Sequence, residues 1–238
     1  MAGRRLDVLT VRWYERREGS DPIVPRWLAA ARAHLPEAVP RRFGDSEPLR
    51  GRFDREGDAG LAAAHDHAEQ LLFLAGAPPV HAAALAARPT TSWGPVAAHT
   101  LHAERGAADD RVRAFALALA GRHTLYVSAS VCRDVLLDRG TLVHDRPGGE
   151  EPYLAALGDW VGLPPEPPLW CWFGPAYVPL VRRHVRAEAV AGGLLRDDGP
   201  WVPEHLRARL DEPDPARRRA PRLPRGLRRS AWRMLFGG

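Results

Sequence analysis

Two pairs of histidines stand at spacings that could hold a metal ion. They are His65-Asp66-His67 and His99-x-x-His102. Residues two apart share a face only on a strand, and residues three apart share a face only on a helix. The surrounding residues predict a helix for the first pair and a strand for the second, so each pair is divided between opposite faces. We therefore expect neither a metal ion nor another cofactor.

Nucleophilic catalysis has no clear signature in this sequence. Ser128 and Ser130 lie in a strand-like stretch without a G-x-S-x-G turn. The chain also lacks a P-loop, a G-x-G-x-x-G following a strand, a C-x-x-C and an H-E-x-x-H. These absences favour a non-catalytic protein. The alternative is an enzyme acting on a small molecule or nucleotide, with histidines and carboxylates converging in one deep pocket. That pocket would lie near His65, His67, His99 and His102.

Arginine is abundant but unevenly distributed. All 34 basic residues are arginine, which together with many Ala, Gly and Pro residues indicates a GC-rich coding sequence rather than a function. Residues 215–238 contain eight arginines and no acid. Removing those eight charges from the net charge of +5 leaves −3 for residues 1–214. The tail could therefore bind nucleic acid or anionic lipid, whereas the body is mildly acidic. The candidate anion-binding residues of the tail are Arg217, Arg218, Arg219, Arg225, Arg228 and Arg229.

The tail also carries an amphipathic pattern, in which Leu223, Leu227, Trp232 and Phe236 alternate with arginine. Such a pattern is typical of a basic helix that contacts a membrane or an external partner. A terminal helix docked on the acidic body is the other interpretation. We divide the chain into a body of residues 1–190, a linker with a short helix at 191–214, and the tail of residues 215–238.

The elements that position these residues follow from hydrophobic periodicity. The pattern predicts strands at 6–14, 71–74, 80–88, 96–104, 124–131 and 169–173, with helices at 24–35, 61–69 and 109–120. Gly174 and Pro175 should turn the last strand into a helix that carries Val178, Val181 and Val185. This order indicates an α+β fold with a largely antiparallel sheet covered by helices. The similar motifs S-W-G-P-V and W-F-G-P-A suggest a two-part pseudo-repeat.

Cellular location is inferred from what the sequence lacks. The chain opens directly on a strand pattern without an apolar leader, and no run of 18 apolar residues follows. Cys132 and Cys171 stand in apolar contexts and are expected to be free thiols. These features predict a cytoplasmic protein with no transmembrane segment.

The segment 35–48, L-P-E-A-V-P-R-R-F-G-D-S-E-P, is predicted to be an extended surface connector. It places two arginines beside two acids, which could either contact a partner or simply form local ion pairs. Together with two aromatic residues that stand beside Gly-Pro turns, it supplies the candidate binding residues. These are Arg41, Arg42, Asp45, Glu47, Trp93 and Tyr177.

The course of residues 6–186 resembles uncharacterised actinobacterial proteins and, more distantly, the immunity proteins of bacterial polymorphic toxin systems. The resemblance rests on the opening strand, the segment 35–48, the W-G-P of the central hairpin, and G-L-P-P-E-P-P-L-W-C-W-F-G-P-A-Y-V at 162–178. It implies an α+β binding module that occludes a toxin-like protein and contributes no catalytic residue. The face of such a module is expected to be polar, largely acidic and without a deep pocket.

Overall fold

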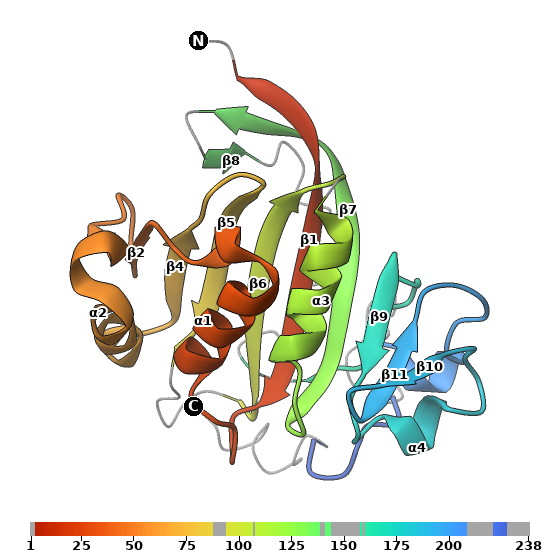
Figure 1. Cartoon of the computed structure of the whole chain (residues 1–238). Helices are drawn as coiled ribbons and strands as arrows, with labels where there is room; N and C mark the ends of the chain where they lie inside the picture. The colour runs from red at the N-terminus through yellow and green to blue at the C-terminus, as the bar shows by residue number, and fades with distance from the viewer. Residues whose placement is uncertain are drawn as a thin grey trace, which may run out of the picture.

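One eleven-stranded sheet runs through the part of the chain that the computed structural model describes (Figure 1). The described residues are 3–87, 94–106, 108–138, 141–143, 158, 160–208 and 221–227. Neighbouring strands are antiparallel, in the order β10-β11-β9-β7-β1-β6-β5-β4-β2-β3, with β8 paired to β7. The predicted α+β class is confirmed. The strands are β1 (Arg4–Arg16), β2 (Arg42–Gly44), β3 (Gly51–Arg52), β4 (Leu71–Ala75), β5 (Val80–Ala86), β6 (Val96–Glu104), β7 (Thr124–Asp138), β8 (Thr141–Val143), β9 (Trp170–Phe173), β10 (Glu188–Val190) and β11 (Gly193–Arg196).

Strand β1 lies at the centre of this sheet, between β6 and β7. Its side chains alternate between the two faces because a strand has a period of two residues. Leu9, Val11 and Trp13 face the helices, whereas Thr10, Arg12 and Tyr14 face the other way. Both faces of its middle are buried, which accounts for its unusually apolar sequence.

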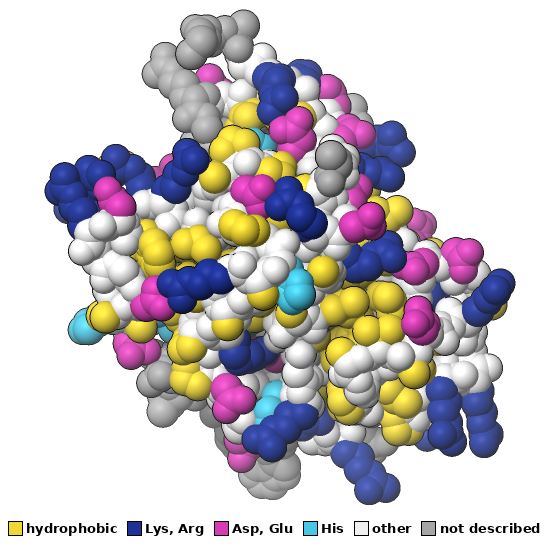
Figure 2. Space-filling view, in the orientation of Figure 1, with side chains coloured by type: hydrophobic (Ala, Val, Ile, Leu, Met, Phe, Trp, Pro, Cys, Tyr) yellow, Lys and Arg dark blue, Asp and Glu magenta, His cyan; other side chains and the backbone are white. Residues whose placement is uncertain are grey.

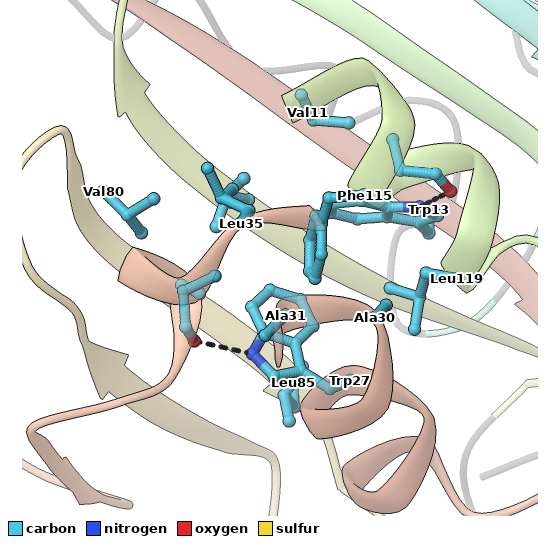
Figure 3. Packing of buried hydrophobic residues seen from close by; sticks show 14 of the residues in the cluster. Val11, Trp13, Trp27, Ala30, Ala31, Leu35, Val80, Leu85, Phe115 and Leu119 are labelled. Atoms are coloured by element: carbon cyan, nitrogen blue, oxygen red, sulfur yellow. Dashed lines mark hydrogen bonds between the residues drawn. The ribbon is translucent and has the colours of Figure 1, made fainter. Parts of the chain in front are cut away.

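Helices cover one face of the sheet (Figure 1). They are α1 (Ile23–His34), α2 (Phe53–His67) and α3 (Asp109–Leu119). Trp13 of β1, Trp27 of α1 and Phe115 of α3 meet edge to face, with ring centroids 4.9 to 5.9 Å apart. Both indole N–H groups donate to backbone carbonyls, as Figure 3 shows, Trp13 to Ala116 and Trp27 to Ala38 at 3.0 Å. The aromatic cluster therefore fixes both helices on the sheet without leaving either indole donor unsatisfied.

A second apolar cluster lies on the opposite face, beneath the C-terminal part of the chain. It joins Tyr14 and Tyr126 of the central strands to Trp160, Phe173 and Tyr177. The indole of Trp160 donates to the hydroxyl of Tyr177 at 2.5 Å. Two residues of the predicted tail, Leu223 and Leu227, are also buried here. The tail segment 221–227 therefore packs on the body, and it does so as a turn rather than as a helix.

Several local predictions need correction. Helix α2 begins at Phe53, earlier than predicted, because Gly57 at φ +59° adopts a conformation that joins two helical turns across a kink. Arg42 lies in β2 rather than in a loop. The predicted helix after Pro175 is only the four-residue α4 (Val178–Val181), and β10 and β11 follow it.

Two expectations about the chain as a whole can be compared with the fold. Cys132 and Cys171 form no disulfide in the structure, and Cys171 is buried whereas Cys132 is half-buried. In the described part of the chain no helix has the length and apolar character needed to cross a membrane.

Candidate functional site

The described part of the sheet carries two concavities on opposite faces, and together they contain six of the residues singled out in the sequence, which are Arg41, Arg42, Glu47, His65, His99 and His102. On the face away from the helices, a groove of about 810 Å³ runs over β2, β4, β5 and β6. On the helical face, a smaller pocket of about 200 Å³ lies beside the start of α1. We call them the open groove and the histidine pocket.

The floor of the open groove is made of small side chains from β4 and β5. Ala75, Ala82 and Ala84 line it, and Phe73 stands beside them with 38% of its surface exposed. In the register of the sheet, Phe73 is opposite Ala84 on one side and Gly44 on the other. Small neighbours on both sides leave the aromatic ring accessible, so the groove has a shallow apolar floor with one large apolar side chain.

The rim of the open groove is cationic. Arg41 and Arg42 are exposed, and Arg42 Nη1 makes only a long contact of 3.4 Å to the carbonyl of Leu49. Among the described residues neither arginine forms an ion pair. Glu47 is the acid that lines the same groove. The two guanidinium groups therefore keep donors available for a carboxylate from outside the chain.

The wall formed by β5 and β6 contributes two histidines. His102 Nδ1 lies 3.1 Å from the hydroxyl of Thr10. His81 is buried 3.7 Å from Glu104, which pairs with Arg4 at 2.7 Å. Burial lowers the pKa of His81, and the nearby Glu104 only partly opposes this. Burial therefore disfavours the charged form of His81, whereas Arg41 and Arg42 bring permanent positive charge to the groove.

The predicted binding residues do not all lie together. Arg41, Arg42 and Glu47 converge on the open groove. Asp45 is exposed beside them, where its carboxylate accepts a hydrogen bond from Ser46, but it does not line the groove. Trp93 lies outside the described residues.

Tyr177 requires a correction, because its side chain is completely buried. Its ring packs against Trp160 in the second apolar cluster, and burial raises the pKa of its hydroxyl. The residue therefore supports the fold beneath β9 and offers no surface to a partner. The aromatic residue near a Gly-Pro turn, which suggested a binding role, is instead part of the packing of this apolar cluster.

Of the candidate anion-binding residues in the tail, Arg225 is described and exposed, and its carbonyl accepts a hydrogen bond from Arg16 at 2.5 Å. The other candidates lie outside the described residues. They are Arg217, Arg218, Arg219, Arg228 and Arg229.

The histidine pocket is organised around a buried carboxylate. Glu15 at the end of β1 accepts hydrogen bonds from both terminal nitrogens of Arg26, at 3.2 and 3.0 Å, and from His99 Nε2 at 3.3 Å. Burial alone would raise the pKa of Glu15, but the hydrogen bond from His99 and the charge and hydrogen bonds of Arg26 lower it to about 2. Glu15 is therefore ionised at every ordinary pH.

The two histidines of this pocket hold the backbone of one residue. The amide of Ala86 donates to His99 Nδ1 at 3.0 Å, and His65 Nε2 lies 2.9 Å from the carbonyl of the same residue. His99 thus accepts at one nitrogen and donates to Glu15 at the other. Both nitrogens of His99 and both oxygens of Glu15 are engaged within the chain, so the network anchors the end of β5.

The remaining histidines of the predicted enzyme pocket do not join it. His67 is exposed on α2, with Nδ1 2.7 Å from the carbonyl of Ala63, and His102 faces the open groove. The expected division of each pair between opposite faces is therefore observed. No cluster of three or more His, Cys, Asp or Glu residues suited to a metal occurs in the described part of the chain.

The comparisons with known proteins give little further information. No protein-family model matches the chain, and no curated protein matches it. Among solved structures, the chain is similar to the Pseudomonas aeruginosa T6SS protein PA0821, at 10% sequence identity and a TM-score of 0.47. The alignment covers 84% of this chain and 68% of that chain.

Proposed function

We propose that this protein is a non-catalytic binding module whose open groove receives a segment of a partner protein. The observation that carries the proposal is the groove of about 810 Å³ on the face of the sheet away from the helices. Its floor presents the exposed ring of Phe73, and its rim presents Arg41 and Arg42, which form no ion pair with another described residue. The histidine pocket gives the enzyme alternative less support, since Glu15 and His99 are bonded within the chain.

The lining of the groove defines the chemistry of the partner segment. A floor of alanines lets the backbone of an extended or helical segment approach the sheet closely. An aliphatic or aromatic side chain of the segment would pack on Phe73, and neighbouring carboxylates would pair with Arg41 and Arg42. We therefore propose a segment that combines acidic and apolar residues.

The immunity-type form of this proposal, in which the partner is a toxin, is supported by the sequence resemblance alone. That resemblance leads to the expectation of a largely acidic face, whereas the groove rim carries two arginines and one glutamate. If the partner is a toxin, its contacting segment should be acidic. Proteins encoded beside this gene are the first partners to test, by co-expression and co-purification.

Selection from a displayed peptide library tests the groove directly, because it requires no candidate partner. The full chain is immobilised and a library of random twelve-residue peptides is selected on it. Selected peptides should be enriched in Asp and Glu next to Leu, Ile, Phe or Trp. Synthetic versions should bind the full chain at least tenfold more weakly after Phe73→Thr or after the double change Arg41→Glu/Arg42→Glu.

The matched control is Arg122→Glu, which changes an exposed arginine at the turn before β7, away from the groove lining. It should leave peptide affinity within about twofold, as expected for a charge far from the contact. Peptides that bind all these variants equally well would contradict the proposal. So would a selection that yields no enriched class on the folded protein.

A further inference from the structure

Arginines are distributed differently over the two ends of the molecule. In the N-terminal two thirds many arginines pair with acids, for example Arg4 with Glu104, Arg111 with Glu37 and Arg32 with Asp58. Around α4 and the 221–227 segment the arginines are exposed and form no ion pair with another described residue. In Figure 2 dark blue side chains project at the lower right, where Figure 1 shows α4.

These side chains form one surface, which we call the basic patch. A tight turn after α4 presents Arg182, Arg183 and His184 together, since the amides of Arg182 and His184 donate to the carbonyls of Val178 and Val181. The ring of His184 lies 6.1 Å from that of His205, and the carbonyl of His205 accepts the amide of Arg222 at 2.7 Å. The patch consists of Arg182, Arg183, His184, Arg186, His205 and Arg222.

The composition of the basic patch narrows the class of ligand. The four arginines are accompanied by three nearby acids, which are Glu188 in β10, Asp198 in the turn whose Gly199 lies against Arg186, and Glu204 beside His205. The large exposed hydrophobic residues of the described chain are Phe73 and Leu169. Phe73 lies in the open groove, and Leu169 precedes β9 at the end opposite α4. The patch therefore has guanidinium and imidazole donors but, among its described residues, no apolar anchor.

We infer that the basic patch binds the phosphate backbone of double-stranded nucleic acid without reading its sequence. Arginine and histidine donors without hydrophobic residues suit phosphate oxygens. A protein interface of ordinary affinity has an apolar or aromatic centre, membrane attachment benefits from apolar insertion, and binding of single strands uses exposed aromatic rings for stacking. The described apolar side chains beside the patch, among them Leu180, Val185 and Trp201, are partly buried against the second apolar cluster and form no large exposed apolar centre. This inference is independent of the open groove.

The test measures binding of the full chain to a fluorescein-labelled 20-base-pair DNA duplex by anisotropy. Affinity should fall steeply between 50 and 200 mM salt, because each arginine–phosphate contact releases counterions. The double variant Arg182→Glu/Arg183→Glu should bind about tenfold or more weakly at 50 mM salt, and its salt slope should be shallower by about two.

The matched control is Arg50→Glu/Arg55→Glu, which changes net charge equally at two exposed positions on the other side of the molecule. It should bind within about twofold of the wild type, as screening weakens the effect of distant charges. If both double variants weaken duplex binding equally, the inference is overturned, because binding would then depend on the net charge of the protein or on the arginine-rich tail and not on the basic patch. Absence of duplex binding, or binding only to vesicles containing phosphatidylserine, would also overturn it. Thermal melts of both variants check that each chain is folded.

Discussion

The open groove and the histidine pocket contain similar kinds of side chain, but these side chains differ in how far they bond within the chain. In the pocket, Glu15, Arg26 and His99 bond to one another and to the backbone. In the groove, Arg41 and Arg42 form no ion pair with another described residue. The comparison teaches that residue types alone do not identify a site. What matters is the hydrogen-bonding and charge-pairing capacity that the fold leaves unused.

Burial explains the difference between the two concavities. A buried charge without a partner costs several kcal/mol, so a carboxylate as buried as Glu15 must be satisfied within the protein. An exposed arginine loses little when it has no partner, since water solvates it. The groove can therefore keep cations for a partner at almost no cost to stability, whereas the pocket cannot.

The largest expected effect comes from breaking the network of the histidine pocket. Glu15→Gln keeps the size of the side chain but leaves Arg26 without its countercharge. We expect it to lower the free energy of unfolding by about 3 kcal/mol, at the lower end of the range for broken buried pairs because Arg26 is partly exposed. Urea unfolding followed by tryptophan fluorescence measures this change.

The control for Glu15→Gln is Glu47→Gln at the rim of the groove, where the carboxylate is exposed and forms no ion pair with a described residue. It should change stability by no more than about 0.5 kcal/mol. Comparable losses in both variants would show that the two concavities do not differ in the way we describe.

Acid should reveal the same network in the unmodified protein. The pKa of Glu15 is about 2 in the folded chain and near 4.5 when unfolded. Because the folded value is lower, the stabilisation is complete above about pH 4.5 and disappears as the pH falls through 2. The shift corresponds to about 3 kcal/mol. Urea titrations from pH 6 to pH 2 should show this loss of unfolding free energy in the wild type. In Glu15→Gln the unfolding free energy should fall by about 3 kcal/mol less over the same range.

The sequence predicts the fold where local pattern and tertiary packing agree. Alternation in β1 and helical spacing in α1 and α3 predict the correct elements, since each has one face that must be buried. The pattern fails after Pro175, where it predicts a continuous helix. There β10 and β11 pair across a turn, β11 pairs with the distant β9, and Trp172 in β9 donates to the carbonyl of Val190. Long-range pairing therefore overrides the local helical spacing.

The site is less predictable because contact between distant segments creates it. The sequence marks Arg41, Arg42 and Glu47 as candidates, but the groove they border depends on β4 and β5, which no local pattern connects to them. Phe73 does carry a local signal, because alternation in L-L-F-L places its ring on the face opposite Leu72 and Leu74. Glu15 also carries a local signal, because the alternation of β1 places this charged residue on the same face as Val11 and Trp13.

A smaller effect is expected from the histidine that contacts the carbonyl of Ala86. His65→Ala removes the partner of a buried carbonyl and should cost about 1–3 kcal/mol. His67→Ala, two residues further on the exposed side of α2, should cost less than about 0.5 kcal/mol. Differential scanning calorimetry on both variants measures the difference. If His67→Ala were the more destabilising change, the assignment of the two faces of α2 would be wrong.

The smallest effect is expected in the open groove, at Phe73. Phe73→Thr removes a ring that is 38% exposed but keeps a residue with high strand propensity, so the unfolding free energy should change by less than about 1 kcal/mol. Its neighbour Leu72 points to the other face and is 0% exposed, and Leu72→Ala should cost about 2–5 kcal/mol. Urea unfolding measures both changes: a shift of the midpoint at an unchanged m-value reports a change in the free energy of unfolding. A loss at Phe73 as large as that at Leu72 would mean that the ring serves the fold, and the groove would then lose its apolar anchor. If Phe73→Thr instead weakens peptide binding without lowering stability, Phe73 serves binding and its neighbour Leu72 serves folding.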